Sequence, residues 1–174
     1  MPEYYRDDAV LIPGRGAVLI AEAGTEPPTA DDLDAWVKAG AVGALNDFFP
    51  IGYTSIDELP GFDSDVEGGE KKGAWENDSL RQTAVKTTDT VNVQPIQWSE
   101  TPLTHRFGPG VIDGEKGHFE VPAAYTATEV ALLIVLIDGN DNLGIHIWKA
   151  ASAPGDGIEF DAEEFAALPI TYTV

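Results

Sequence analysis

The strongest constraint on the fold is an apolar run in the C-terminal half of the chain. Residues 128–138 read Thr-Glu-Val-Ala-Leu-Leu-Ile-Val-Leu-Ile-Asp, and a turn at 139–142 joins them to the alternating segment 143–149. Two β-prone segments joined by glycine, asparagine and aspartate predict a β-hairpin. Because the first strand is apolar on both faces and the second alternates, we expect other strands to cover one side of the pair and solvent or a partner to meet the other.

Other segments also predict strands. Residues 17–21 form a compact apolar run, residues 83–98 alternate with period two, and residues 51–56 and 170–174 are short β-prone pieces. Pro95 is expected at a strand end, a bulge or an edge, because proline has no N–H to donate within a sheet. These segments predict a mainly β protein with a β-sandwich or small-barrel architecture.

Two or three short helices are expected around the strands. Thr29 can cap a helix that runs to Lys38, with acidic residues in its first turn. Thr101 can cap a second helix that has Pro102 at its first position and ends at Gly108. A capped helical turn is also expected at residues 161–168.

The domain organisation predicted from these elements is a single domain over residues 1–174. Residues 1–16 are expected to form an N-terminal arm that ends in a turn rich in glycine and proline. Residues 57–73 are rich in glycine and acidic side chains, and predict a long exposed loop. Loops of this length are usually functional or disordered, so we expect this one to become ordered only in an assembly.

The charge of the chain argues against nucleic-acid binding. Ten Lys+Arg against 30 Asp+Glu give a formal net charge of −20. Such a chain repels phosphate backbones, although solubility alone would also account for the acidity. The first residues show no signal pattern and the apolar run at 130–137 is too short to cross a bilayer, so we expect a product made soluble in the cytoplasm, without membrane contact.

The residues that carry chemistry form no recognisable catalytic pattern. The chain has no cysteine, and His105, His118 and His146 lack the spacing of metal ligands. Residues 138–142 resemble the start of a calcium loop, but Leu143 stands where glycine is required and Lys149 where a glutamate should be. We therefore expect a hairpin turn there, no bound metal, no cofactor and no enzymatic activity.

Two alternatives remain open on the residues alone. The chain has four tryptophans, Trp36, Trp75, Trp98 and Trp148, which would suit a small acidic carbohydrate-binding module if they stack on sugars. Adjacent acids could support a carboxylate hydrolase, but such pairs are expected by chance among 30 acidic residues. These acid pairs are Asp7–Asp8, Asp31–Asp32 and Glu163–Glu164.

Several segments share a family likeness in order and spacing. They are residues 12–24, 52–60 and 73–81 in the first half, and 131–139, 149–152 and 158–169 in the second. Together they resemble the major tail tube proteins of long-tailed phages of actinobacteria, over nearly the whole chain. No further immunoglobulin-like domain is expected after Val174.

The resemblance implies a β-sandwich subunit of the virion tail that forms hexameric rings, which stack into a tube for the genome. Its partners would be further copies, a tape-measure protein, and tail terminator and tip proteins, with DNA passing without specific binding. The long loop would contact the next ring, and the alternating strand would meet a neighbouring subunit. The candidate inter-ring residues are Asp57, Glu58, Leu59, Phe62, Asp63, Asp65 and Glu67, and the candidate subunit-interface residues are Ile145, Ile147 and Trp148.

Overall fold

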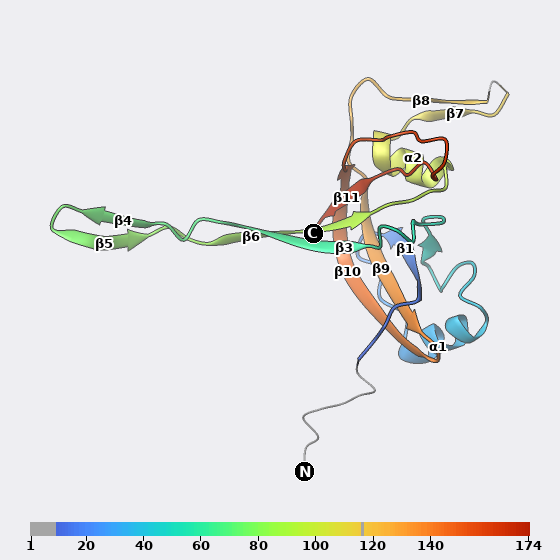
Figure 1. Cartoon of the computed structure of the whole chain (residues 1–174), viewed down its shortest axis with the longest axis horizontal. Coiled ribbons are helices and arrows are strands. Elements are labelled where there is room, and N and C mark those ends of the chain that lie inside the picture. The colour runs from blue at the N-terminus through green and yellow to red at the C-terminus, as the bar shows by residue number, and fades with distance from the viewer. Residues whose placement is uncertain (1–9, 116) are drawn as a thin grey trace, which may run out of the picture.

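The computed structural model describes residues 10–115 and 117–174, and shows a β-rich body from which a long hairpin projects (Figure 1). The predicted mainly β class is confirmed, with α1 and α2 in place of the two or three short helices expected. The N-terminal arm predicted for residues 1–16 lies largely outside the described residues. In chain order the elements are β1 (Arg15–Glu22), α1 (Ala30–Lys38), β2 (Phe49–Pro50), β3 (Gly61–Glu67), β4 (Lys71–Ala74), β5 (Asn77–Gln82), β6 (Lys86–Val93), α2 (Glu100–Phe107), β7 (Val111–Asp113), β8 (His118–Glu120), β9 (Glu129–Asp138), β10 (Asp141–Pro154) and β11 (Ile170–Thr173).

Seven strands form one open antiparallel sheet in the order β2-β1-β9-β10-β11-β6-β3. The 14-residue strand β10 connects its two halves, because its first part pairs with β9 and its last part, from Ala151, pairs with β11. The register with β9 shifts between Ile147 and Ala150, which marks a bulge in β10 just before its pairing with β11 begins. The sheet does not close, so β2 and β3 remain as its edges.

The predicted hairpin is confirmed as β9 and β10, and β9 is buried on both faces. One face packs Leu132 and Ile134 against Tyr172 and other strand residues, and the opposite face packs Leu133 and Val135 against α1 and the segment before β2. Each large apolar side chain buried in this way stabilises the fold by about 1.5–3 kcal/mol. The expectation that solvent or a partner meets one side of the hairpin is wrong for β9, because α1 of the same chain covers that side.

Three of the four ends of α1 and α2 lie where the sequence predicted them. Thr29 caps α1 through a capping box with Asp32, as predicted. Gly108, at φ 92°, ends α2, but the N-cap of α2 is Ser99, so Thr101 lies inside the first turn. No third helical turn forms at 161–168. There the Asp161 carboxylate accepts a hydrogen bond from the backbone N–H of Glu163 at 2.8 Å, as a helix cap would, but no helix follows it.

The prediction for residues 51–73 differs most from the structure. Residues 51–56 form no strand and contribute only an isolated bridge between Thr54 and Pro95. The predicted loop at 57–73 is exposed, but its conformation is corrected: Gly61–Glu67 and Lys71–Ala74 are strands. Gly61–Glu67 does alternate, with Asp63, Asp65 and Glu67 on one face, but the glycine and acidic residues around it are typical of a loop.

Candidate functional site

The projecting hairpin, called the β-arm (residues 61–92), is continuous from root to apex. Its root pairs β3 with β6, from Gly61↔Asn92 to Glu67↔Lys86, and its outer part pairs β4 with β5. Between them, the Thr83 N–H donates to the Glu70 carbonyl at 3.0 Å. Ala74↔Asn77 is the last pair, so Trp75 and Glu76 form the apex.

The outer β-arm has no core of its own. Every residue of β4 and β5 is exposed, and Trp75 at the apex is 99% exposed. At about 3.3 Å per residue, the stretch from Gly61 to Trp75 reaches roughly 45 Å, and Figure 1 shows it leaving the body. An isolated two-stranded hairpin is marginally stable in water, so this segment has the character of a surface that awaits a partner.

The candidate inter-ring residues gather at the root of the β-arm. Asp57, Glu58 and Leu59 lie in the turn before β3, and the other four lie on β3 itself. All seven are exposed. Successive strand residues point to opposite faces, so Asp63, Asp65 and Glu67 form an acidic row along one face of this edge strand.

Of the subunit-interface candidates, only Trp148 presents a large exposed surface. It is 55% exposed and packs edge-on against the His146 ring at 4.8 Å. Ile147 is 8% exposed and Ile145 half-buried, both against the core of the chain itself. The apolar pattern of β9 could have indicated this burial. A strand that is apolar on both faces shares its core with the apolar face of the strand that pairs with it.

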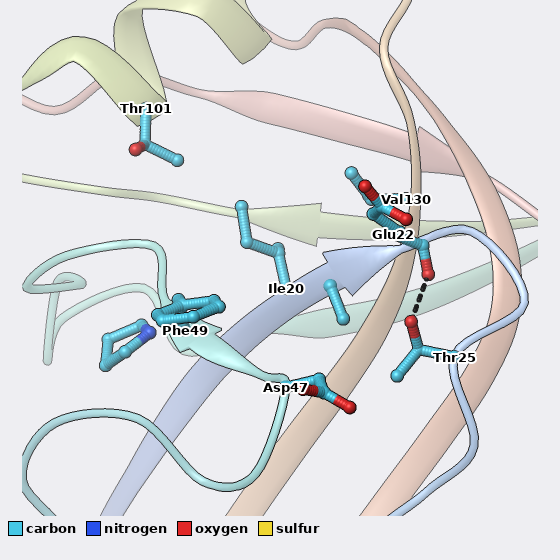
Figure 2. A pocket seen from close by; sticks show the side chains of 9 residues that line it. Ile20, Glu22, Thr25, Asp47, Phe49, Thr101 and Val130 are labelled. Carbon is cyan, nitrogen blue, oxygen red and sulfur yellow. Dashed lines mark hydrogen bonds between the residues drawn. The ribbon is translucent and has the colours of Figure 1, made fainter.

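A hollow of about 600 Å³, called the edge depression, lies beside the edge strand β2 (Figure 2). Glu22 and Asp47 contribute exposed carboxylates, while Ile20, Phe49 and Val130 contribute apolar surface. The Thr25 hydroxyl donates to the Glu22 carbonyl at 2.7 Å. Its full lining is Ile20, Ala21, Glu22, Thr25, Asp47, Phe49, Pro50, Thr101 and Val130. The titratable side chains of this lining are the carboxylates of Glu22 and Asp47.

A buried polar network fastens α2 to the sheet. A His105 ring nitrogen lies 2.7 Å from the Tyr172 hydroxyl, and Tyr125 donates to the His105 carbonyl at 3.2 Å. Burial lowers the pKa of His105 to about 4 and raises that of Tyr172. His105 is 4% exposed, so this neutral imidazole has no access to a substrate and serves packing. No sequence motif marked this network.

Next to it, Arg106 anchors the segment that follows β10. Its guanidinium donates to the carbonyls of Gly155 at 3.3 Å and Asp156 at 2.8 Å. Burial lowers the pKa of Arg106, while the neighbouring Tyr125 and Asp156 raise it. The side chain thus acts as a structural donor to the backbone.

The tryptophans of the carbohydrate-binding alternative lie on four separate elements. Trp36 is buried on α1, Trp75 stands at the β-arm apex and Trp148 lies on β10. Trp98 stacks beside Phe160 and donates to the Ala166 carbonyl at 2.9 Å. The structure therefore builds no shared stacking platform from them.

The acid pairs of the hydrolase alternative do not converge. Asp32 belongs to the capping box of α1, and its hydrogen bonds from Thr29 and Asn46 lower its pKa. Glu163 and Glu164 are exposed in an irregular segment, and Asp7–Asp8 lie outside the described residues. Within residues 10–115 and 117–174, no group of three or more His, Asp or Glu side chains is placed to hold a metal ion. Over the same residues, no helix is long and apolar enough to cross a bilayer.

Comparison with known proteins shows which family and which relatives the chain is similar to. The family described as phage tail tube protein matches residues 5–174. The chain is 36% identical over 174 residues to the major tail protein Gp23 of Mycobacterium phage D29, covering 96% of this chain and 85% of the relative. It is also 36% identical over 178 residues to the major tail protein Gp23 of Mycobacterium phage L5, with the same coverage.

Proposed function

The chain belongs to the phage tail tube protein family, and on that premise we propose that its copies assemble into stacked hexameric rings that conduct the phage genome. As a member of this family it is a structural protein of the virion tail. The other partners in the proposal are a tape-measure protein and the tail terminator and tip proteins.

The observation that carries the proposal is the β-arm. Its outer strands bury no side chain within the subunit, yet they are paired and extended. Apolar residues exposed on it, such as Leu80 and Val66, would be costly to leave in water in a functional particle. A contact with another copy would cover them.

The edges of the sheet support the same conclusion. The outward-facing backbone groups of β2 and β3 are free to pair or pack with a neighbour. We propose that the acidic row Asp63, Asp65 and Glu67, with the turn before it, contacts the adjacent ring. Trp148 is proposed as the main contact within a ring, because it is 55% exposed whereas Ile147 is 8% exposed in the subunit.

The net charge fits a conduit for DNA. A charge of −20 per copy repels phosphates, so a lumen lined by this protein would not retain the genome through salt bridges. The same charge opposes association of free subunits, which makes assembly dependent on ionic strength.

The test is assembly of the purified chain. We expect rings or filaments by negative-stain electron microscopy and sedimentation velocity when the protein is concentrated and salt is raised to screen the charge. A species that remains monomeric under these conditions, with or without preformed tail tubes as seeds, would refute the proposal.

A further inference from the structure

The outer β-arm differs in charge from the rest of the chain. Residues 68–85, beyond the Glu67↔Lys86 pair, contain three of the ten basic residues and three of the 30 acidic ones, so their net charge is 0 against −20 elsewhere. The three basic residues are Lys71, Lys72 and Arg81. Opposite charges attract, so these cations complement the acidic body of another copy.

The arrangement of these cations favours a binding partner outside the subunit. Lys72 and Arg81 are cross-strand partners on one face, and like charges placed directly opposite each other destabilise a hairpin. Among the described residues, the ion pairs are Lys38–Asp34, Lys149–Glu129 and His118–Glu120, and none involves the β-arm. Carboxylates from outside the subunit would relieve this repulsion.

The apex adds an apolar anchor to the charges. Trp75 is 99% exposed and stands beyond the last strand pair, three residues after Lys72 in the chain. Tryptophan and arginine are the residue types that most often dominate the binding energy of protein interfaces.

The edge depression has the complementary composition. Its apolar surface from Ile20 and Phe49 can receive an aromatic ring, and about 600 Å³ is within the range of small binding pockets. The carboxylates of Glu22 and Asp47 are exposed and, among the described residues, have no basic partner. Figure 2 shows the two carboxylates among the lining side chains.

The β-arm and the edge depression lie at opposite edges of the seven-stranded sheet. The β-arm grows from the edge strand β3, whereas the depression adjoins the edge strand β2. The β-arm leads away from the body of its own copy (Figure 1), so an apex that reaches the depression would have to come from a second copy. Contacts between two different patches are head-to-tail, and they generate closed rings or filaments.

We propose that the β-arm apex of one copy docks in the edge depression of a second copy. Trp75 packs against Ile20 and Phe49, while Lys72 and Arg81 face Glu22 and Asp47. The inference rests on the proposed self-assembly and specifies one of its contacts.

The test uses disulfide cross-linking, because the chain has no cysteine of its own. One variant carries Glu76→Cys at the apex, and another carries Pro50→Cys in the depression, so that both leave the proposed contact residues in place. After the two proteins are mixed and mildly oxidised, we expect a mixed disulfide dimer, identified by intact mass. Val42→Cys, at a position 82% exposed and outside the depression, replaces Pro50→Cys as the control.

Additional substitutions identify the contacts. Trp75→Ala in the Glu76→Cys protein should lower the cross-linking rate at least roughly tenfold, as expected for an interface anchor. Lys72→Glu with Arg81→Glu should also lower it, and Glu22→Lys with Asp47→Lys in the Pro50→Cys protein should restore it. Failure of this charge exchange to restore the rate would overturn the pairing.

The outcomes separate this inference from the proposed function. If the unmodified protein assembles but Glu76→Cys and Pro50→Cys do not cross-link, or Val42→Cys cross-links equally well, the docking inference is wrong and the tube proposal stands. If the unmodified protein does not assemble, the tube proposal fails, and the mixed dimer by itself still decides whether the apex docks in the depression.

Discussion

Strands β9 and β5 represent opposite ways of stabilising an extended chain. In β9 every residue from Val130 to Val135 is buried, between two apolar clusters. In β5 every residue is exposed, and its only neighbour is β4. The body therefore derives its stability from its own side chains, whereas the β-arm relies on backbone pairing and on whatever it later contacts.

The difference separates folding from assembly. Removing side chains from the body should unfold the subunit, while removing side chains from the outer β-arm should leave the subunit folded and change only its association. Each prediction below tests one side of this contrast.

The largest expected effect is the loss of assembly when the outer β-arm is removed. Glu67 and Lys86 are cross-strand partners, so residues 68–85 can be replaced by the two-residue turn Asn-Gly. We expect no rings or filaments by electron microscopy, with a thermal midpoint within a few degrees of the full chain. Persistent polymers, or a midpoint lowered by about 10 °C, would contradict the separation of body and β-arm.

A matched pair of leucines gives the next largest effect. Leu132 is fully buried in the body and Leu80 is 66% exposed on the β-arm. Leu132→Ala should lower the free energy of unfolding by about 2–5 kcal/mol, because it removes buried contacts and leaves a cavity. Leu80→Ala should change it by less than about 0.5 kcal/mol. Urea unfolding of dilute, unassembled protein measures both, and similar values for the two would break the contrast.

The third effect is a pH dependence confined to the body. His105 has a folded pKa of about 4 against its ordinary 6.5, so between these values the unfolded chain binds a proton that the folded chain does not. The free energy of unfolding should therefore fall as the pH falls from about 6.5 to 4, by up to about 3 kcal/mol.

His105→Gln supplies the control for this effect, since it keeps a hydrogen-bonding group without titrating. The difference between its stability curve and that of the unmodified chain isolates His105 from the many carboxylates. Residues 61–92 contain no histidine, so the chain without the outer β-arm should show the same pH dependence. A difference curve that is flat with pH would show that His105 is protonated equally in both states.

The smallest expected effect concerns the cap of α1, which covers one face of β9. Thr29→Ala removes the hydroxyl of the capping box and should cost about 1 kcal/mol, whereas Thr29→Ser should restore most of it. Thermal unfolding of the two variants measures the difference. An unchanged midpoint in Thr29→Ala would show that packing alone holds α1 on the body.

Local signals accounted for much of the fold. The β9–β10 hairpin, β1 and the Thr29 cap were predicted because turn residues, apolar periodicity and capping side chains act within a few residues. The β-arm strands were missed, since the glycine and acidic residues around β3 are typical of a loop, and β4 and β5 have no apolar face that would give a periodicity. The start of α2 was misplaced because Ser99 and Thr101 are both acceptable caps, and the structure selects Ser99.

The candidate site was predictable only in outline. The exposed acidic segment before and along β3 was located by composition, but the burial of Ile147 in the subunit was not predicted. The edge depression, the buried His105 and the cationic face of Lys72 and Arg81 had no motif to mark them. Each arises from residues far apart in the chain.

The amino-acid sequence by itself determined the central hairpin, the capped helix α1, the absence of cysteine and the strongly negative charge, because these depend on residues and their near neighbours. Only the tertiary structure decided which faces of β9 and β10 are covered, where the sheet stays open and which cations lack partners. A period of two shows that a strand has two different faces, but the segments that pack on each face come from elsewhere in the chain.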